Sequence, residues 1–245
     1  NLYKNTYGNK VIFEEINDDL GIGFQYGWYN SEKFGFVKKS EILSFTQEAL
    51  SIDILDGIVN ILPNGVDYDF QNAYSSLLDA YKKSELLPES KLGLYMLSSI
   101  PVDRAEPSES LRAASVWLCG ADLDAKILIS TEQVDNFIHG IAVEQEVDIR
   151  AKRGAYFVNA SFNLPKEARK EWMIVAEVNR DSSDVANLDF FLKKTTNIAE
   201  LIKADILKGT ENLKQIVSKA DGIQVSNEEL NVARHFSNTL FNVMR

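Results

Sequence analysis

The sequence predicts a mainly β protein, a large antiparallel β-sandwich over residues 1–182 that is followed by helices over residues 183–245. Between about residues 10 and 178, short runs of alternating apolar and polar residues are separated by turn residues. Long helices do not intervene regularly between these runs, which disfavours a parallel sheet. After Val178 the alternation stops, and apolar residues recur at helical spacing. We therefore expect a sandwich domain and a helical linker.

The strand assignments rest on alternation along each run. Phe24, Tyr26 and Trp28 fall on one face of a run at residues 23–29, and Ile52 and Ile54 do so in the run at residues 50–55. Further runs of this kind cover residues 91–100, 112–119, 126–130, 145–150, 154–163 and 171–178. Many short strands with turns between them are typical of an antiparallel sandwich.

One helix is expected within the β region, over residues 70–85, because its apolar residues recur every three or four positions. The preceding segment contains Pro63 and the Asn64-Gly65 pair, which are strong turn formers. The predicted fold therefore contains a single inserted helix.

The last segment, residues 227–245, is predicted to form an amphipathic helix with Ser226 as its N-cap. Its apolar stripe contains Leu230, Ala233, Phe236, Leu240 and Val243. The stripe runs to the end of the sequence without a C-cap glycine. We therefore expect this helix to continue, or to pack, into something beyond Arg245.

Composition excludes several classes of function. The 26 Lys and Arg residues against 36 Asp and Glu residues give a net charge of −10, which argues against a nucleic-acid partner. No window approaches the roughly 20 apolar residues of a membrane span. Cys119 is the single cysteine and His139 and His235 are far apart, so we expect no metal site. No motif requires an organic cofactor, and the compartment stays open between cytoplasm and periplasm.

The densest polar run lies between two predicted strands, at residues 98–110. Pro101 and Pro107 stiffen this connection, so that Asp103, Arg104 and Glu106 would be presented by a rigid loop. We consider these three as substrate-binding residues. The alternative is that Arg104 makes a local ion pair that only fixes the loop, and the residues alone do not decide between the two.

Aromatic residues on a strand give a second candidate site. Tyr26, Trp28 and Tyr29 could form a flat surface on which a sugar ring stacks, and Trp28 is our candidate substrate-binding residue there. Alternating aromatics in a strand are more often core residues, so burial in the core is the competing interpretation.

Three stretches together resemble the N-terminal region of the glycoside phosphorylases that act on cellobiose and chitobiose, and of their uncharacterised relatives. The stretches are residues 55–65 (LDGIVNILPNG), residues 77–86 (LLDAYKKSEL) with 98–109 (SSIPVDRAEPSE), and residues 233–245 (ARHFSNTLFNVMR). The resemblance implies a sandwich of the galactose-mutarotase-like supersandwich type, then linker helices, then an (α/α)6 barrel.

The resemblance also implies where the chemistry lies. In that family the general acid and most sugar and phosphate contacts belong to the barrel, so no catalytic residue is carried over to this chain. The sandwich packs against the barrel and contributes loops to the active-site rim or to a homodimer interface. The loop at residues 101–109 would take this role, with Arg104 as a donor to a sugar hydroxyl or an acidic group and Glu106 as an acceptor.

Three functions therefore compete. The first is a non-catalytic N-terminal domain of a carbohydrate-active enzyme, with a carbohydrate and a C-terminal catalytic domain as its partners. The second is a stand-alone carbohydrate-binding module that uses the aromatics or the Arg104 loop. The third is a structural or assembly domain whose apolar helical stripe docks a partner or a second copy.

Overall fold

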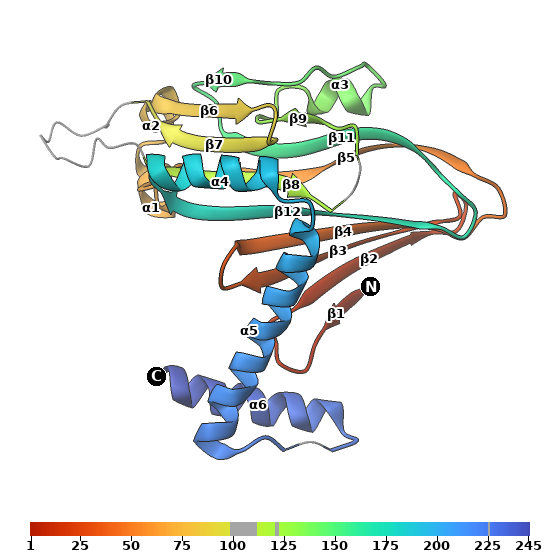
Figure 1. Ribbon diagram of the computed structural model, residues 1–245, viewed down its shortest axis with the longest axis vertical. Helices are drawn as coiled ribbons and strands as arrows, with labels where there is room; N and C mark the ends of the chain where they lie inside the picture. Colours follow the sequence, from red (N-terminus) through yellow and green to blue (C-terminus); the bar gives the residue numbers. More distant parts are fainter. Residues whose placement is uncertain (99–111, 121–122, 225) are drawn as a thin grey trace, which may run out of the picture.

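The computed structural model describes residues 1–98, 112–120, 123–224 and 226–245. Strands dominate up to Arg180, and three helices follow (Figure 1). All strand pairs in the described part are antiparallel. The prediction of a mainly antiparallel β region followed by helices is thereby confirmed. The division into two domains at residue 182 stays a prediction.

The larger sheet has nine strands in the order β1-β2-β3-β4-β12-β8-β7-β6-β10. In chain order these are β1 (Leu2–Lys4), β2 (Val11–Asn17), β3 (Ile22–Ser31), β4 (Gly35–Ser44), β6 (Lys82–Leu87), β7 (Leu92–Leu97), β8 (Ala113–Cys119), β10 (Asp148–Arg150) and β12 (Arg169–Arg180). Four consecutive strands thus form one side of the sheet, and β12 joins them to the rest.

The smaller sheet has three strands in the order β5-β11-β9, which are β5 (Leu50–Ile61), β9 (Lys126–Leu128) and β11 (Gly154–Leu164). One face of each sheet contributes to a common apolar core. Trp172 and Ile174 of the large sheet share this core with Tyr156 and Val158 of the small sheet, and all four are fully buried. Burial of such large side chains is the main favourable term in folding.

The opposite face of the large sheet is covered by helices α4 (Ser182–Lys194) and α5 (Ile198–Asp221). A second apolar cluster lies there, in which Trp117 and Val175 of the sheet pack near Phe191 of α4 and Ile202 of α5. The Asp181 side chain begins α4 by accepting hydrogen bonds from the backbone N–H groups of Ser183 and Asp184. The large sheet is therefore buried on both faces at its centre.

The single helix expected over residues 70–85 is not confirmed. Two short helices, α1 (Tyr68–Ala73) and α2 (Ser75–Tyr81), occupy its first part, and β6 begins at Lys82. Tyr74 interrupts the helix with φ −126° and ψ 28°. Lys82 is buried, where its ammonium group contacts Gln71 and Asp79 while its backbone pairs with Leu97 of β7. Pairing with β7 thus overrides the helical spacing. A third short helix, α3 (Val134–Ile138), was not predicted.

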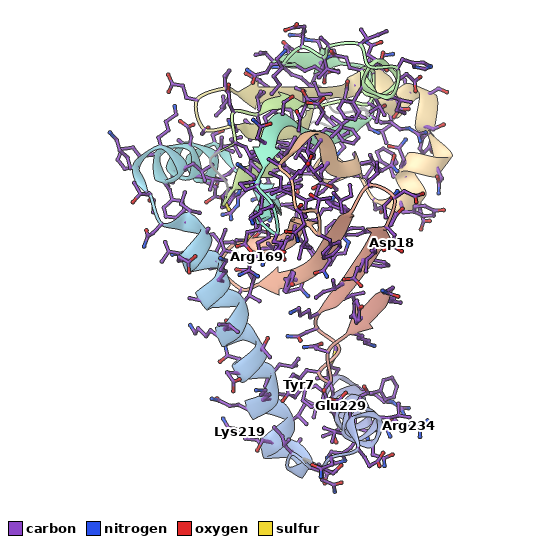
Figure 2. All side chains as sticks on the ribbon, turned by 90° about the vertical axis from the view of Figure 1, so that its right-hand side faces the viewer. Tyr7, Asp18, Arg169, Lys219, Glu229 and Arg234 are labelled. Carbon is purple, nitrogen blue, oxygen red and sulfur yellow. The ribbon has the colours of Figure 1, made fainter. Side chains whose placement is uncertain are left out.

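Helix α6 (Glu229–Met244) packs at the far end of α5 from α4 (Figure 1). The tip of the β1–β2 hairpin reaches both helices, as Figure 2 shows for Tyr7. The Tyr7 ring contacts Phe236 of α6 edge-on at a centroid distance of 5.0 Å, and Asn9 donates a hydrogen bond to Thr210 of α5. The structure begins α6 after Glu228, without a side-chain cap, so Ser226 is not its N-cap.

Candidate functional site

The sequence-predicted site residues divide into two groups. Asp103, Arg104 and Glu106 lie outside the described residues. Trp28 lies on β3, directly opposite Val11 of β2 and Lys38 of β4 in the large sheet, and it is half-buried. The structure therefore locates only one of the four predicted side chains.

Trp28 belongs to what we call the aromatic surface, made by Phe13, Tyr26 and Trp28 on one face of β2 and β3. Phe13 and Tyr26 are paired across the strands and their rings are stacked, with centroids 5.0 Å apart. Phe24 shares this face but packs against the common core. Tyr29 faces the other way, toward α5, so it is not part of the surface predicted from Tyr26, Trp28 and Tyr29.

A buried ionic cluster adjoins the aromatic surface. The Lys38 ammonium lies over the Tyr26 ring, 5.2 Å from its centroid, and forms an ion pair with Asp56 of β5. Asp56 also accepts hydrogen bonds from the Ser40 hydroxyl and the Trp172 indole N–H, at 2.7 and 2.8 Å. Every charged group of the cluster has partners within the core, so its arrangement suits a structural role.

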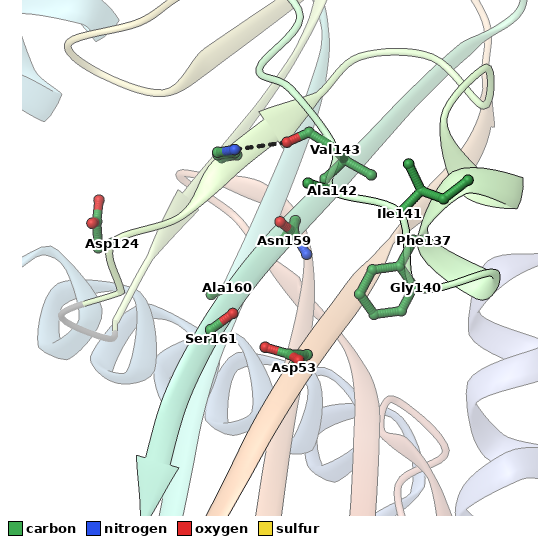
Figure 3. A pocket seen from close by; sticks show the side chains of 11 residues that line it. Asp53, Asp124, Phe137, Gly140, Ile141, Ala142, Val143, Asn159, Ala160 and Ser161 are labelled. Carbon is green, nitrogen blue, oxygen red and sulfur yellow. Dashed lines mark hydrogen bonds between the residues drawn. The ribbon is translucent and has the colours of Figure 1, made fainter.

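A cavity of about 510 Å³ opens on the outer face of the small sheet (Figure 3). We call it the outer pocket. Its floor carries polar side chains from all three strands. Ser161 of β11 is paired with Asp53 of β5, and Asn159 of β11 with Lys126 of β9, so each pair projects side by side from the sheet. The side chains that line the pocket are those of Asp53, Asp124, Lys126, Phe137, Ile141, Ala142, Val143, Asn159, Ala160 and Ser161, with Gly140.

The roof of the outer pocket comes from α3 and the segment after it, which present Phe137 and Ile141. Glu146 anchors this segment. Its buried carboxylate accepts hydrogen bonds from the backbone N–H groups of Ile129 and Ser130, both at 2.8 Å, and from the Gln133 amide at 2.9 Å. These donors precede α3 and Glu146 follows it. The hydrogen bonds therefore connect the two ends of the segment that contains α3 and fix the position of the roof.

The positive and negative side chains of the outer pocket differ in whether they have partners within the protein. Lys126 donates a hydrogen bond to the Val143 carbonyl at 2.7 Å and lies 3.7 Å from the Glu144 carboxylate. In the described part of the chain, the carboxylates of Asp53 and Asp124 have no hydrogen-bond or ion-pair partner. Among its described lining residues, the pocket thus presents two unpaired carboxylates, while its one cation is engaged with the protein.

Sequence reasoning did not find the outer pocket. Alternation alone places Asp53 on the outward face of its strand, and it does the same for Asn159 and Ser161. That these residues become neighbours depends on the pairing of β5 with β11, two strands about 100 residues apart. Outward polar residues on adjacent strands were the available signal, but the register could not be read from the sequence.

Neither a metal centre nor a membrane-spanning helix is found in the described ranges. They contain no group of three or more His, Cys, Asp or Glu side chains placed to hold a metal ion. Within the same ranges, no helix has both the length and the apolar character needed to cross a membrane.

Comparison with known proteins finds similarity only in structure. No known protein family and no curated protein matches the sequence. A bacterial glucoamylase complexed with acarbose matches 91% of this chain with 11% identity and a TM-score of 0.45. A protein from the human microbiome, for which kojibiose phosphorylase activity has been proposed, matches 95% of this chain with 7% identity and a TM-score of 0.32. A galactose mutarotase-like protein from Clostridium acetobutylicum matches 70% with 8% identity and a TM-score of 0.31.

All three structures are of proteins named for carbohydrate chemistry. The chain covers 30%, 23% and 62% of their respective lengths. At TM-scores below 0.5, these likenesses assign neither a family nor an activity to this chain.

Proposed function

We propose that the chain is the non-catalytic N-terminal β-sandwich domain and helical linker of a carbohydrate-active enzyme of the glycoside phosphorylase or hydrolase type. The sandwich would be of the galactose-mutarotase-like supersandwich type. The core that the two sheets share supports this assignment, as does the order of a β region followed by helices. The resemblance to cellobiose and chitobiose phosphorylases supplies the enzyme class. The linker would lead into an (α/α)6 barrel that performs the catalysis.

The observation that carries the proposal is the number of large apolar side chains that stay exposed on helices α5 and α6, which follow the β region (Figure 1). Five large apolar side chains there are 48–77% exposed, namely those of Leu207, Ile216, Leu230, Phe241 and Met244. Helices that keep this much apolar surface in water usually bury it against a partner. A helical catalytic domain that follows the linker would supply that partner.

Reading the coding sequence beyond Arg245 tests this proposal directly. We expect several hundred codons of paired amphipathic helices with carboxylates on their inner faces. We also expect the 245-residue chain alone to show no turnover of β-linked disaccharides, with or without phosphate, while the longer protein does. A stop codon directly after Arg245, or enzyme-like rates for the chain alone, would overturn the proposal.

The loop at residues 101–109 retains its proposed role at the active-site rim or in a homodimer interface. Arg104 would donate to a sugar hydroxyl or an acidic group, Glu106 would accept, and Asp103 would be presented beside them. In the longer protein, Arg104→Ala should raise KM or weaken dimerisation, while Arg112→Ala, beyond the loop, should leave both unchanged. Equal behaviour of the two variants would remove the loop from the site.

A stand-alone carbohydrate-binding module is the second candidate, and the aromatic surface favours it. Phe13 and Tyr26 form a stacked pair on the face of the sheet that carries Trp28, and the Phe13 side chain is exposed. Sugar rings bind aromatic faces through their C–H groups. Calorimetry with β-linked oligosaccharides should show binding that Trp28→Ala weakens and Trp117→Phe, in the buried second cluster, does not. Absence of heat at millimolar ligand would count against this function.

A further inference from the structure

We propose that the outer pocket binds a single pyranose unit and prefers an amine-bearing sugar to a neutral one, while it rejects phosphorylated sugars. The proposal rests on the lining of the pocket and not on the scaffold function argued above. The aromatic surface is a separate site, on the large sheet.

The size and shape of the pocket suit a small ring. Its volume of about 510 Å³ lies within the roughly 300–1,000 Å³ that ligand pockets usually occupy. The floor and the roof differ in chemistry. Polar strand side chains form the floor, and Phe137 and Ile141 form the roof (Figure 3). A pyranose has hydroxyls around its rim and C–H groups on its faces, so it matches such a divided lining.

The floor offers more acceptors than donors. The Asn159 amide donates to the Ile54 carbonyl at 3.0 Å, which leaves its own carbonyl oxygen as an acceptor. The Asp53 carboxylate and the Ser161 hydroxyl are strand partners, and in the described part of the chain neither has a hydrogen-bond partner. Sugar hydroxyls can donate to these acceptors, and hydrogen bonds to a carboxylate are about twice as strong as neutral ones.

The charge distribution decides the preference among sugars. Lys126 donates to the Val143 carbonyl and lies 3.7 Å from the Glu144 carboxylate, so its ammonium group already has an acceptor and a nearby counter-charge. Asp53 and Asp124 therefore give the pocket a net negative character. An ammonium substituent would pair with Asp53, whereas a phosphate would meet two carboxylates without a free cation to offset them.

The experiment is a titration of the full 245-residue chain, followed by NMR or calorimetry, with glucosamine, glucose and glucose 6-phosphate at a pH where the amine is protonated. We expect saturable binding of the first two sugars, with glucosamine several-fold tighter, and no binding of glucose 6-phosphate. The glucosamine preference should shrink as salt is added, because its source is electrostatic.

Two variants separate the contributions, and both are compared with matched controls. Phe137→Ala should weaken the binding of both sugars by about tenfold, while Phe190→Ala, at an exposed position of α4, should leave their affinities unchanged. Asp53→Asn should abolish the preference for glucosamine and largely retain glucose binding, whereas Asp221→Asn at the end of α5 should not affect the preference.

Several results would overturn the proposal. These are the absence of saturable binding, glucose 6-phosphate binding as tightly as glucose, wild-type affinity in Phe137→Ala, or a glucosamine preference that survives in Asp53→Asn. Binding that is lost in Trp28→Ala but retained in Phe137→Ala would place the ligand on the aromatic surface and also reject the outer pocket. None of these results depends on any sequence beyond Arg245, so they are distinguishable from failure of the scaffold function.

Discussion

Lys38 of β4 and Asp56 of β5 form a buried ion pair that connects the two sheets across their common core. Each partner has further contacts. Lys38 donates to the Gly57 carbonyl at 2.9 Å, and Asp56 accepts from Ser40 and Trp172. The pair therefore joins β4, β5 and β12 at one point in the core.

Removal of one partner should destabilise the protein strongly, because a buried charge is then left without its counter-charge. We expect Lys38→Met to lower the free energy of unfolding by about 3–5 kcal/mol. The double variant Lys38→Met with Asp56→Asn should recover part of this loss, since the introduced asparagine is neutral and keeps an acceptor for Trp172. Chemical denaturation measures both values.

Lys39→Met is the matched control for the Lys38 prediction. Lys39 lies on the opposite face of β4 and pairs with Glu171, where both side chains are partly exposed. Such pairs contribute about 0–1 kcal/mol. If both lysine variants lost the same free energy of unfolding, the buried pair would contribute no more to stability than the exposed pair.

Phe236 should anchor helix α6 far more strongly than Phe241 does. Phe236 is 2% exposed and contacts Tyr7, whereas Phe241 is 65% exposed on the same helix. Truncation of a buried Phe to Ala costs about 3–5 kcal/mol. We expect Phe236→Ala to increase hydrogen exchange of the α6 amides sharply and Phe241→Ala to leave it unchanged. Similar protection in both variants would contradict the packing of α6 on the hairpin tip.

Asp205 should make the attachment of α5 sensitive to acid. Its carboxylate accepts hydrogen bonds from the Ser31 hydroxyl and the Lys33 backbone N–H, which lie at the end of β3 and in the turn after it. Burial by itself raises the pKa of Asp205, but these two hydrogen bonds lower the pKa overall. The folded-state pKa thus lies below that of the unfolded chain.

Stability from Asp205 is therefore present above the unfolded pKa of about 3.9 and is lost as the pH falls through the folded pKa. Asp205→Asn should lower the free energy of unfolding by about 1 kcal/mol near neutral pH. The difference from wild type should vanish in acid. Asp221→Asn, at the exposed end of the same helix, should match wild type at every pH. A constant Asp205→Asn difference across the acid range would contradict the linkage.

Cys119 should be unreactive in the folded protein. Burial raises the pKa of its thiol to about 12, and nearby Lys203 offsets only part of this. Because the thiolate is the reactive form, labelling by a disulfide reagent at about pH 8 should be slow and should become fast on unfolding. Rapid labelling without denaturant would show that the β8 end opens readily.

The raised pKa of Cys119 also makes the free energy of unfolding depend on pH in the alkaline range. Its contribution is complete below the unfolded pKa and declines as the pH rises through the window up to about 12, because only the unfolded chain releases the proton there. As the pH is raised from neutral to alkaline, the free energy of unfolding should therefore fall less in Cys119→Ala than in the wild type. Tyr95 and Tyr156, whose pKa values burial raises well above the usual range, remain in both proteins.

Local patterns predicted eight of the strands and the helical end of the chain, but not β1, β2, β4, β6 or the inserted helices. Alternation such as that of Phe24, Tyr26 and Trp28 reports which residues share a face, and the structure retains this arrangement. The helical spacing over residues 70–85 was misleading because Lys82 belongs to β6. There, pairing with β7 and contacts with Asp79 and Gln71 outweigh local propensity.

The candidate sites were less accessible to prediction for a different reason. A strand pattern shows that Asp53 points outward, but only the register with β11 brings it beside Ser161. The Lys38–Asp56 pair joins different sheets and was equally invisible. Trp28 could be named as a candidate from the sequence because aromatic character and alternation are both local properties, and its role in binding stays a prediction.

The central position of β12 determines when the large sheet can be completed during synthesis. Strands β1 to β4 can pair as soon as they emerge, but the free edge of β4 must wait for residues 169–176, its partners in β12. About 125 residues separate the end of β4 from the start of β12. At about 5–20 residues per second the edge stays unpaired for roughly 6–25 seconds. Throughout this interval its free N–H and C=O groups can pair with another nascent chain. Slow translation before residue 169 should therefore favour aggregation of the emerging protein, and a chaperone that covers the β4 edge should suppress it.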